Sequence, residues 1–298
     1  MKDYGISLKR QGHIAIITFE RPAKQNALDQ HMFDSLDKVV AELKGSLPRV
    51  IVLTGAGDKA FCAGFDVNPE NPLLKPLSTA MERHDKGPAY DLIHRIRTST
   101  DNLVSLPVPI IAAINGLAYG GGAEIASRCD LRVMDPGAVI CFSEVRLGLM
   151  PDHGGVVGLT HLVGASRAAD LILTARKVYA EEAFQLGLIN RISAPGKALE
   201  EALSLALSIT QNGPRAVRHA LYVIRKTGDL TTQEALELET EAAATLIASG
   251  ESIHGISAFS RGRRQSSRNP ENPEMKLSYP QKFKAACPWC KMHIDILS

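Results

Sequence analysis

The sequence has few aromatic residues, few cysteines and no excess of charge of either sign. Aromatic residues make up 5% of the 298 residues, which leaves few rings to stack on the bases of single-stranded nucleic acid. A formal net charge of +2 gives no general field that would draw the chain to nucleic acid or to an anionic membrane. Five cysteines are too sparse for a disulfide-stapled secreted scaffold. We therefore expect a reducing compartment, no nucleic-acid partner and no membrane partner.

The sequence also lacks an unbroken apolar run that would serve as a signal or a membrane span. The first twenty residues mix charged with apolar side chains, which disfavours a secretory signal. The longest uncharged stretch, 102–123, is interrupted by Pro107, Pro109 and the glycines 120–122, which favours strand, turn and glycine loop over a transmembrane helix. We expect a cytoplasmic protein.

Apolar residues are abundant, and their spacing predicts an α/β protein. They make up 45% of the chain, enough for one large core. The pattern predicts a strand hairpin at the N-terminus, and then strands alternating with helices; these elements are a hairpin over 4–19, helices over 26–45, 91–106 and 121–128, and strands over 49–54, 108–114, 130–134 and 139–142. The β-α-β order predicts a layered sheet with right-handed crossovers. We expect the proline-rich stretch 68–87 to be a mobile connector or lid.

The composition changes along the chain and predicts three regions. Residues 1–195 form the expected core domain, and residues 196–266 are expected to be helical almost throughout. Residues 267–298 have little periodicity and contain four prolines with Cys287 and Cys290, so we interpret them as a flexible tail. The other three cysteines are interpreted as core residues.

The sharpest local feature is the run of three glycines at 120–122. Glycines at a strand-to-helix junction leave backbone N–H groups uncovered, and the start of a helix favours an anion, so the run is typical of an oxyanion site. The alternative is that the glycines only permit a close contact between helix and strand. A dinucleotide fingerprint is disfavoured because the G-x-G-x-x-G order is absent.

Two carboxylates, Glu124 and Glu144, follow the glycines. Paired carboxylates in an apolar cleft can divide acid and base roles, because burial and mutual repulsion separate their pKa values. The alternative for Glu124 is a helix-dipole preference in a first turn, and the alternative for Glu144 is an ion pair with Arg146 or Arg128.

Several segments in order resemble the crotonase superfamily of enoyl-CoA hydratases and isomerases. These are AFCAGFD at 60–66, IAAINGLAYGGGAE at 111–124, SEVRLGLMP at 143–151 and GLIN at 187–190. The resemblance covers about residues 5–265 and implies a spiral of ββα units with a helical C-terminal region that forms a homotrimer or a dimer of trimers. It also implies an acyl-CoA thioester substrate, with no metal and no cofactor other than the CoA of the substrate.

The resemblance assigns roles residue by residue. It implies an oxyanion hole made by the backbone N–H groups of Phe65 and Gly121, with Glu144 as proton donor to the α-carbon and Glu124 orienting the water. It places CoA contacts on the backbone around five further residues: Lys24, Ala27, Ala63, Asp66 and Val67. Enoyl-CoA hydratase is therefore the first hypothesis.

Two departures from the hydratase pattern leave alternatives open. Phe65 stands where typical hydratases have alanine, and Asp152-His153-Gly154-Gly155 replaces their Gly-Ala-Gly-Gly. Asp152 falls where dienoyl-CoA isomerases carry a catalytic aspartate, although we favour an N-cap role for it. We interpret His153, like other lone histidines, as a surface or satisfied core residue. The alternatives are an enoyl- or dienoyl-CoA isomerase, a cyclic oxo-acyl-CoA hydrolase and, disfavoured by an acidic first helix, a non-catalytic or RNA-binding relative.

Overall fold

The computed structural model describes residues 5–260, so the expected tail at 267–298 lies outside the described residues. The chain divides into two compact units, with the boundary between Ser208 and Ile209. This boundary lies near the end of α8 (Ala198–Thr210). The two units are described separately below, and all the expected site residues belong to the first.

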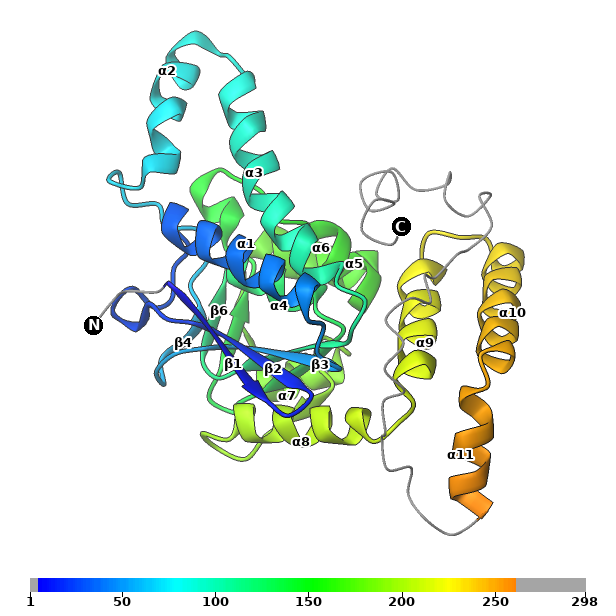
Figure 1. Cartoon of the computed structure of the whole chain (residues 1–298). Coiled ribbons are helices and arrows are strands. Elements are labelled where there is room, and N and C mark those ends of the chain that lie inside the picture. Colours follow the sequence, from blue (N-terminus) through cyan, green and yellow to red (C-terminus); the bar gives the residue numbers. More distant parts are fainter. Residues whose placement is uncertain (1–4, 261–298) are drawn as a thin grey trace. The chain divides into compact units, whose positions relative to one another are not determined.

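The first unit contains two sheets. One has the strand order β1 (Ile6–Gln11), β2 (Ile14–Phe19), β3 (Val50–Gly55), β5 (Ile110–Ile114), β7 (Leu131–Met134) and β10 (Arg191–Ile192); the other has the order β4 (Ala60–Cys62), β6 (Leu117–Tyr119), β8 (Val139–Cys141) and β9 (Val178–Tyr179). Three successive strand pairs, β3–β4, β5–β6 and β7–β8, each send one strand to each sheet. The neighbours within these sets are parallel. This repeated step produces the expected spiral of ββα units (Figure 1).

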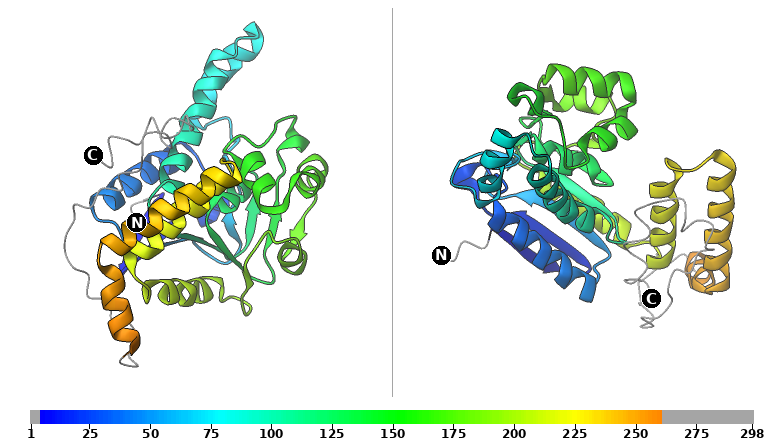
Figure 2. Two further views of the ribbon diagram at one scale, coloured as in Figure 1. Left: turned by 90° about the vertical axis from the view of Figure 1, so that its right-hand side faces the viewer. Right: turned by 90° about the horizontal axis from the view of Figure 1, so that it is seen from above.

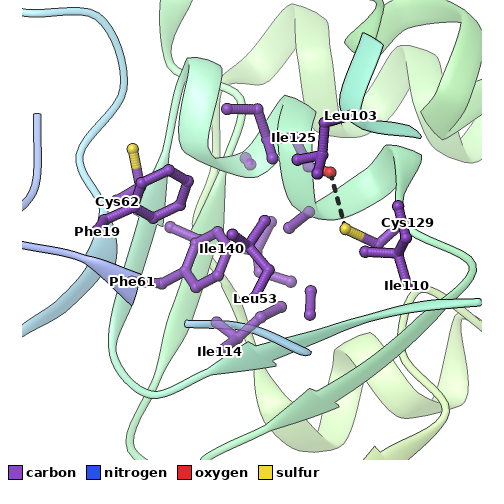
Figure 3. Close-up of a cluster of buried hydrophobic side chains, with 14 of the residues drawn as sticks. Phe19, Leu53, Phe61, Cys62, Leu103, Ile110, Ile114, Ile125, Cys129 and Ile140 are labelled. Atoms are coloured by element: carbon purple, nitrogen blue, oxygen red, sulfur yellow. Dashed lines mark hydrogen bonds between the residues drawn. The ribbon is translucent and has the colours of Figure 1, made fainter. Parts of the chain in front are cut away.

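The core lies between these sheets and their helices. Every residue of β3 and of β5 is buried, as expected for central parallel strands covered on both faces. Figure 3 shows the side chains of Phe19 and Phe61 beside Leu53 and Ile114. The two phenyl rings meet edge to face, with centroids 5.6 Å apart.

Three free cysteines belong to this buried interior. Cys62, Cys129 and Cys141 are all buried thiols, which confirms their interpretation as core residues. Burial raises the pKa of the Cys62 thiol to about 12. These thiols therefore act as small apolar groups.

The helix expected from residue 26 begins later. Helix α1 spans Gln30–Gly45, and the Asp29 side chain accepts a hydrogen bond from Met32 N at 3.0 Å, which marks the N-cap. Asn26 has a left-handed backbone with φ 57°, which no helix residue can adopt. Gln25 and Asn26 are both left-handed and separate the short turn at 22–24 from the helix, and this segment takes part in the site described below.

The expected connector at 68–87 is wrong as a description of the backbone, because most of it is helical. It contains the short turn η2 (Pro72–Leu74) and α2 (Lys75–Arg83), and α3 (Gly87–Val104) begins at its end. Pro72, Pro76 and Pro88 lie in the first turns of these elements, where a missing N–H and a fixed φ are tolerated. Figures 1 and 2 show α2 and α3 as a helical hairpin that projects beyond the sheets.

The remaining helices of the first unit follow the strands of the second sheet. They are α4 (Gly121–Arg128), α5 (Gly155–Val163), α6 (Ala165–Thr174) and α7 (Ala180–Gln185), with the short turns η1 (Pro22–Lys24) and η3 (Glu144–Leu147). Helix α5 contacts both α4 and α6. The start of α5 is thus held against the helix that follows the glycine run.

The second unit is helical over its described residues. It contains α9 (Pro214–Thr227), α10 (Thr232–Ala248) and α11 (Glu251–Ser260). A capping box between Thr231 and Glu234 starts α10, and α9 packs along α10 (Figure 1). Across residues 5–260, no helix has the length and apolarity needed to cross a membrane.

Candidate active site

The functional residues follow the carboxyl ends of three neighbouring strands. β4 pairs with β6, and β6 pairs with β8, all in parallel. Phe65 lies three residues beyond β4, Gly121 two beyond β6 and Glu144 three beyond β8. Because parallel strands end at the same edge of a sheet, three segments that are distant in sequence meet there.

The loop after β4 lies directly against the start of α4. Gly64 has φ 92°, and a methyl group built on it would lie 2.9 Å from the backbone nitrogen of Gly121. A methyl group on Gly122 would collide with the carbonyl oxygen of Cys62. Within residues 5–260, the N–H groups of Phe65 and Gly121 donate to no protein acceptor. The glycines therefore permit the close contact that the alternative interpretation expected, and they also leave two neighbouring donors available, so the oxyanion site stays a prediction.

Glu124 is buried on α4, and its two carboxylate oxygens differ. Oε2 accepts hydrogen bonds from His153 N and Gly155 N, both at 2.8 Å. Oε1 is buried, and it has no hydrogen-bond partner among the described residues. The residue is 1% exposed, so it does more than favour the dipole of an exposed first turn. One oxygen holds the loop before α5, and the other is available to a ligand.

Glu144, in the turn η3, has two buried oxygens that also lack a hydrogen-bond partner in the described part of the chain. The two ion pairs considered for it are wrong. Arg128 Nη2 pairs with Asp101 at 2.6 Å, and Arg146 Nη2 donates to the carbonyl of Ala175 at 2.6 Å. Glu144 is thus an acid without a structural partner in residues 5–260, which is typical of a reacting group.

Burial and the charge of Glu144 raise the pKa values of the acids in the site. Burial raises the pKa of Glu124, and the charge of Glu144 raises it further. Burial also raises the pKa of Glu144. Because two neighbouring buried carboxylates repel one another, ionisation of both is unfavourable, and their titration belongs to the pair.

Asp152 belongs to the same electrostatic group. Burial, followed by the charge of Glu144, raises the pKa of Asp152 to about 6. The N-cap role that we favoured for it is wrong, because α5 begins at Gly155 and its N-cap is Gly154, without a side-chain hydrogen bond. Gly154 has φ 92°, a left-handed turn that places Asp152 ahead of the cap position. The structure therefore brings three acids together.

Comparisons with known proteins agree with this geometry. A profile of the family "Enoyl-CoA hydratase/isomerase" matches residues 9–267. This chain belongs to that family, within the crotonase superfamily. The short-chain-enoyl-CoA hydratase of Clostridium acetobutylicum is 33% identical over 260 residues, which cover 87% of this chain and 95% of that protein. The carnitinyl-CoA dehydratase of Salmonella arizonae is 33% identical over 230 residues, 77% of this chain and 83% of that protein.

Solved structures agree as well. The crystal structure of an enoyl-CoA hydratase from Bacillus anthracis has a TM-score of 0.80 and 32% identity to this chain, and covers 89% of this chain and 99% of that chain. The crotonase fold expected from the sequence is therefore confirmed. The relatives include both hydratase and dehydratase names, so family membership leaves the reaction to be argued from the site.

In this crotonase-superfamily member, the segments expected to contact CoA lie side by side. Ala63 N donates to Gln25 O at 3.0 Å, and Leu28 N donates to Gly64 O at 2.8 Å. This ladder places Lys24 and Ala27 beside the loop that carries Ala63, Asp66 and Val67. Lys24 and Val67 are exposed, whereas Ala27, Ala63 and Asp66 are half-buried.

An arginine that the sequence reasoning missed fixes this pair of segments. Arg21 Nη1 contacts Asp66 Oδ2 at 2.6 Å and donates to the carbonyl of Ala27 at 3.1 Å. Burial opposes ionisation of Asp66, but the hydrogen bonds from Arg21 and Asn68 N, together with the charges of Arg21 and Lys24, outweigh burial and lower the pKa of that carboxyl. Asp66 is thus already occupied by Arg21, which favours a structural task for its side chain.

His153 is buried, which agrees with its interpretation as a core residue, but its Nδ1 atom has no hydrogen-bond partner among the described residues. The residue is 1% exposed, and its ring lies against Phe33 with centroids 5.9 Å apart. Burial and the charge of Arg128 lower the pKa of His153 to about 4, so the ring is neutral at physiological pH. The sequence signal for an unusual role of His153 was that it stands where typical hydratases have alanine. Among residues 5–260, no cluster of three or more His, Cys, Asp or Glu side chains has a metal-binding arrangement.

Proposed function

We propose that this protein is an enoyl-CoA hydratase that adds water across the double bond of a 2-enoyl-CoA. The observation that supports the proposal is that unpaired hydrogen-bond donors and unpaired acceptors lie together at one sheet edge. Two backbone N–H groups, of Phe65 and Gly121, lack acceptors in the described chain, and three oxygens of Glu124 and Glu144 lack donors there. The two donors can bind an oxyanion, and the three acceptor oxygens can bind a water molecule.

The proposed reaction uses these groups in order. The thioester carbonyl accepts hydrogen bonds from Phe65 N and Gly121 N, which polarises the conjugated double bond. Water adds to the β-carbon and gives one proton to the carboxyl pair, while the π electrons move toward the carbonyl oxygen as an enolate. Glu144 then delivers a proton to the α-carbon, and the water's proton restores the pair. Glu124 orients the water through its unpartnered oxygen.

The raised pKa values of both glutamates support this scheme. A hydratase needs one carboxyl that holds a proton for delivery and one that is ionised to receive a proton. Raised pKa values in two neighbouring buried carboxyls favour a state in which one is protonated and the other is ionised, and that state meets both needs. The segments 24–27 and 63–67 lie beside the oxyanion donors, where they would hold the CoA part of the substrate through their backbone.

The test is direct. Incubation with a 2-enoyl-CoA should consume the conjugated thioester and yield a 3-hydroxyacyl-CoA. Glu144→Gln should bind a non-reactive acyl-CoA as the parent protein does, while kcat falls by about 10²-fold to 10⁴-fold. Unchanged turnover in that variant would contradict the proposal.

A double-bond isomerase is the second candidate, and Asp152 favours it. Asp152 interacts electrostatically with Glu144, so it offers a second carboxyl that can hold the proton while it moves from one carbon to another. Such an enzyme would convert a 3,5-dienoyl-CoA to an isomer without forming any hydroxyacyl product. Separate incubations with 2-enoyl-CoA and 3,5-dienoyl-CoA distinguish the two reactions.

We also propose that the second unit mediates assembly into a homotrimer or a dimer of trimers. Large apolar side chains are exposed on all three of its described helices: Ile224, Leu236, Ile247, Ile253 and Ile256. Apolar surface of this kind marks protein contacts. Sedimentation analysis of the full chain tests the proposal, which a stable monomer at micromolar concentration would contradict.

A further inference from the structure

The ring of His153 lies beside the proposed oxyanion hole. A methyl group built on Gly121 would lie 3.0 Å from the Cε1 atom and 3.2 Å from the Nδ1 atom of His153, so only glycine leaves room for the ring. On another side the ring packs on Phe33, which in turn packs on Phe65 with centroids 6.5 Å apart. His153 therefore borders Gly121 directly, and Phe33 separates it from Phe65.

The two ring nitrogens have different surroundings. Nε2 lies 3.6 Å from Oδ1 of Asp152, and this carboxylate favours the tautomer with the proton on Nε2. Nδ1 is buried and has no hydrogen-bond partner among the described residues. In that tautomer Nδ1 is an acceptor, and an acceptor that stays buried without a donor costs free energy. In residues 5–260, five buried side-chain atoms have no hydrogen-bond partner, and four of them belong to this site: Glu124 Oε1, both Glu144 oxygens and His153 Nδ1.

We propose that His153 is a specificity-determining residue, whose Nδ1 accepts a hydrogen bond from a hydroxyl group on the acyl chain of the CoA ester. The loop backbone fixes the ring for this task, because His153 N donates to Glu124 and His153 O accepts from Arg128 at 2.9 Å. With the ring neutral, it accepts the bond without an added charge. The acyl chain of a thioester held by Phe65 and Gly121 begins beside Gly121, which the ring borders.

The proposal rests on the proposed function only for the choice of CoA esters as ligands. It names a substrate class: acyl-CoA esters that carry a hydroxyl group beyond the reacting carbons. A site built to bind a hydroxyl discriminates strongly against the analogue that lacks it, because the buried acceptor is then left unpaired. A plain hydrocarbon chain would bind more weakly for that reason.

Binding of saturated esters tests the inference without any chemical step. Calorimetry would compare hexanoyl-CoA with its 4-, 5- and 6-hydroxy derivatives on the full-length protein. At least one hydroxylated ester should bind about 10-fold to 100-fold more tightly than hexanoyl-CoA. His153→Phe keeps an aromatic ring but removes the acceptor, and should abolish this difference.

Two further variants complete the design. His153→Ala restores the residue that typical hydratases carry, so it guards against a folding failure of the phenylalanine variant and should also abolish the difference. His161→Ala alters an exposed histidine of the same helix region and should leave the preference intact. Equal binding of all four esters by the parent protein, absence of binding, or a preference that survives in both His153 variants overturns the inference. Turnover of 2-enoyl-CoA by the parent protein judges the hydratase proposal independently.

Discussion

Replacing Glu124 and Glu144 by alanine and by glutamine should separate structure from chemistry at this site. Glu124 Oε2 accepts hydrogen bonds from His153 N and Gly155 N, each at 2.8 Å, whereas both oxygens of Glu144 lack partners in residues 5–260. Glu124 therefore has one structural oxygen and one oxygen that the described residues leave unpaired. Both oxygens of Glu144 are of the second kind.

The magnitudes follow from the number of donors left unpaired. Glu124→Ala orphans two buried N–H groups at about 1–3 kcal/mol each, so the free energy of unfolding should fall by about 2–6 kcal/mol. Glu124→Gln keeps a carbonyl oxygen in the same place and should cost under about 1 kcal/mol. Glu144→Ala orphans no described donor, and its cost should also be under about 1 kcal/mol. All three variants should lose about 10²-fold to 10⁴-fold in kcat.

Urea denaturation at pH 7 would measure the stability of each variant, and the ultraviolet absorbance of a 2-enoyl-CoA would report its turnover. The matched comparison is alanine at the two glutamate positions, because the same atoms are removed from each. Equal destabilisation by Glu124→Ala and Glu144→Ala would refute the assignment of one structural oxygen to Glu124. A glutamine variant at Glu124 as unstable as the alanine variant would refute it too.

Three other perturbations test the surroundings of the acids. Burial raises the pKa of Asp152 to about 6 from an ordinary 3.8, so between these two pH values the folded state retains a proton that the unfolded state has lost. Relative to Asp152→Asn, the free energy of unfolding should therefore fall by about 1–2 kcal/mol as pH rises across that window, a figure that includes solvent screening of the partly exposed carboxyl. Denaturation at several pH values would measure the change. Gly122→Ala would drive a methyl group into the Cys62 carbonyl and should cost at least about 1–3 kcal/mol and most of the activity, whereas Gly45→Ala, in open space on a helix, should be neutral or stabilising. Arg128→Met leaves Asp101 without its ion-pair partner and removes a hydrogen bond to the carbonyl of His153, in the loop before α5. The free energy of unfolding should therefore fall by about 3 kcal/mol, and Arg128→Lys, which keeps the charge, should recover part of that loss.

Much of the fold could be predicted from the local order of residue types. The buried strands around residues 50 and 110 and the helix after the glycine run were predicted because continuous apolar runs and glycine junctions have strong local preferences. Strands β4 and β6 were missed, since three residues give too short a pattern to distinguish a strand from a loop. The helices of the expected connector were missed because prolines were interpreted as breaks, although they occupy first turns.

The sequence by itself determined the family and the spiral fold and selected the two glutamates as candidates, because these depend on residue types in a fixed order. Only the tertiary structure decided the surroundings of each acid. Asp152 and His153 follow one another in the chain, and no local pattern distinguishes a helix cap from a buried acid beside Glu144. The distinction depends on long-range burial and charge, which exist only once β4, β6 and β8 end at one sheet edge and α5 is held against α4.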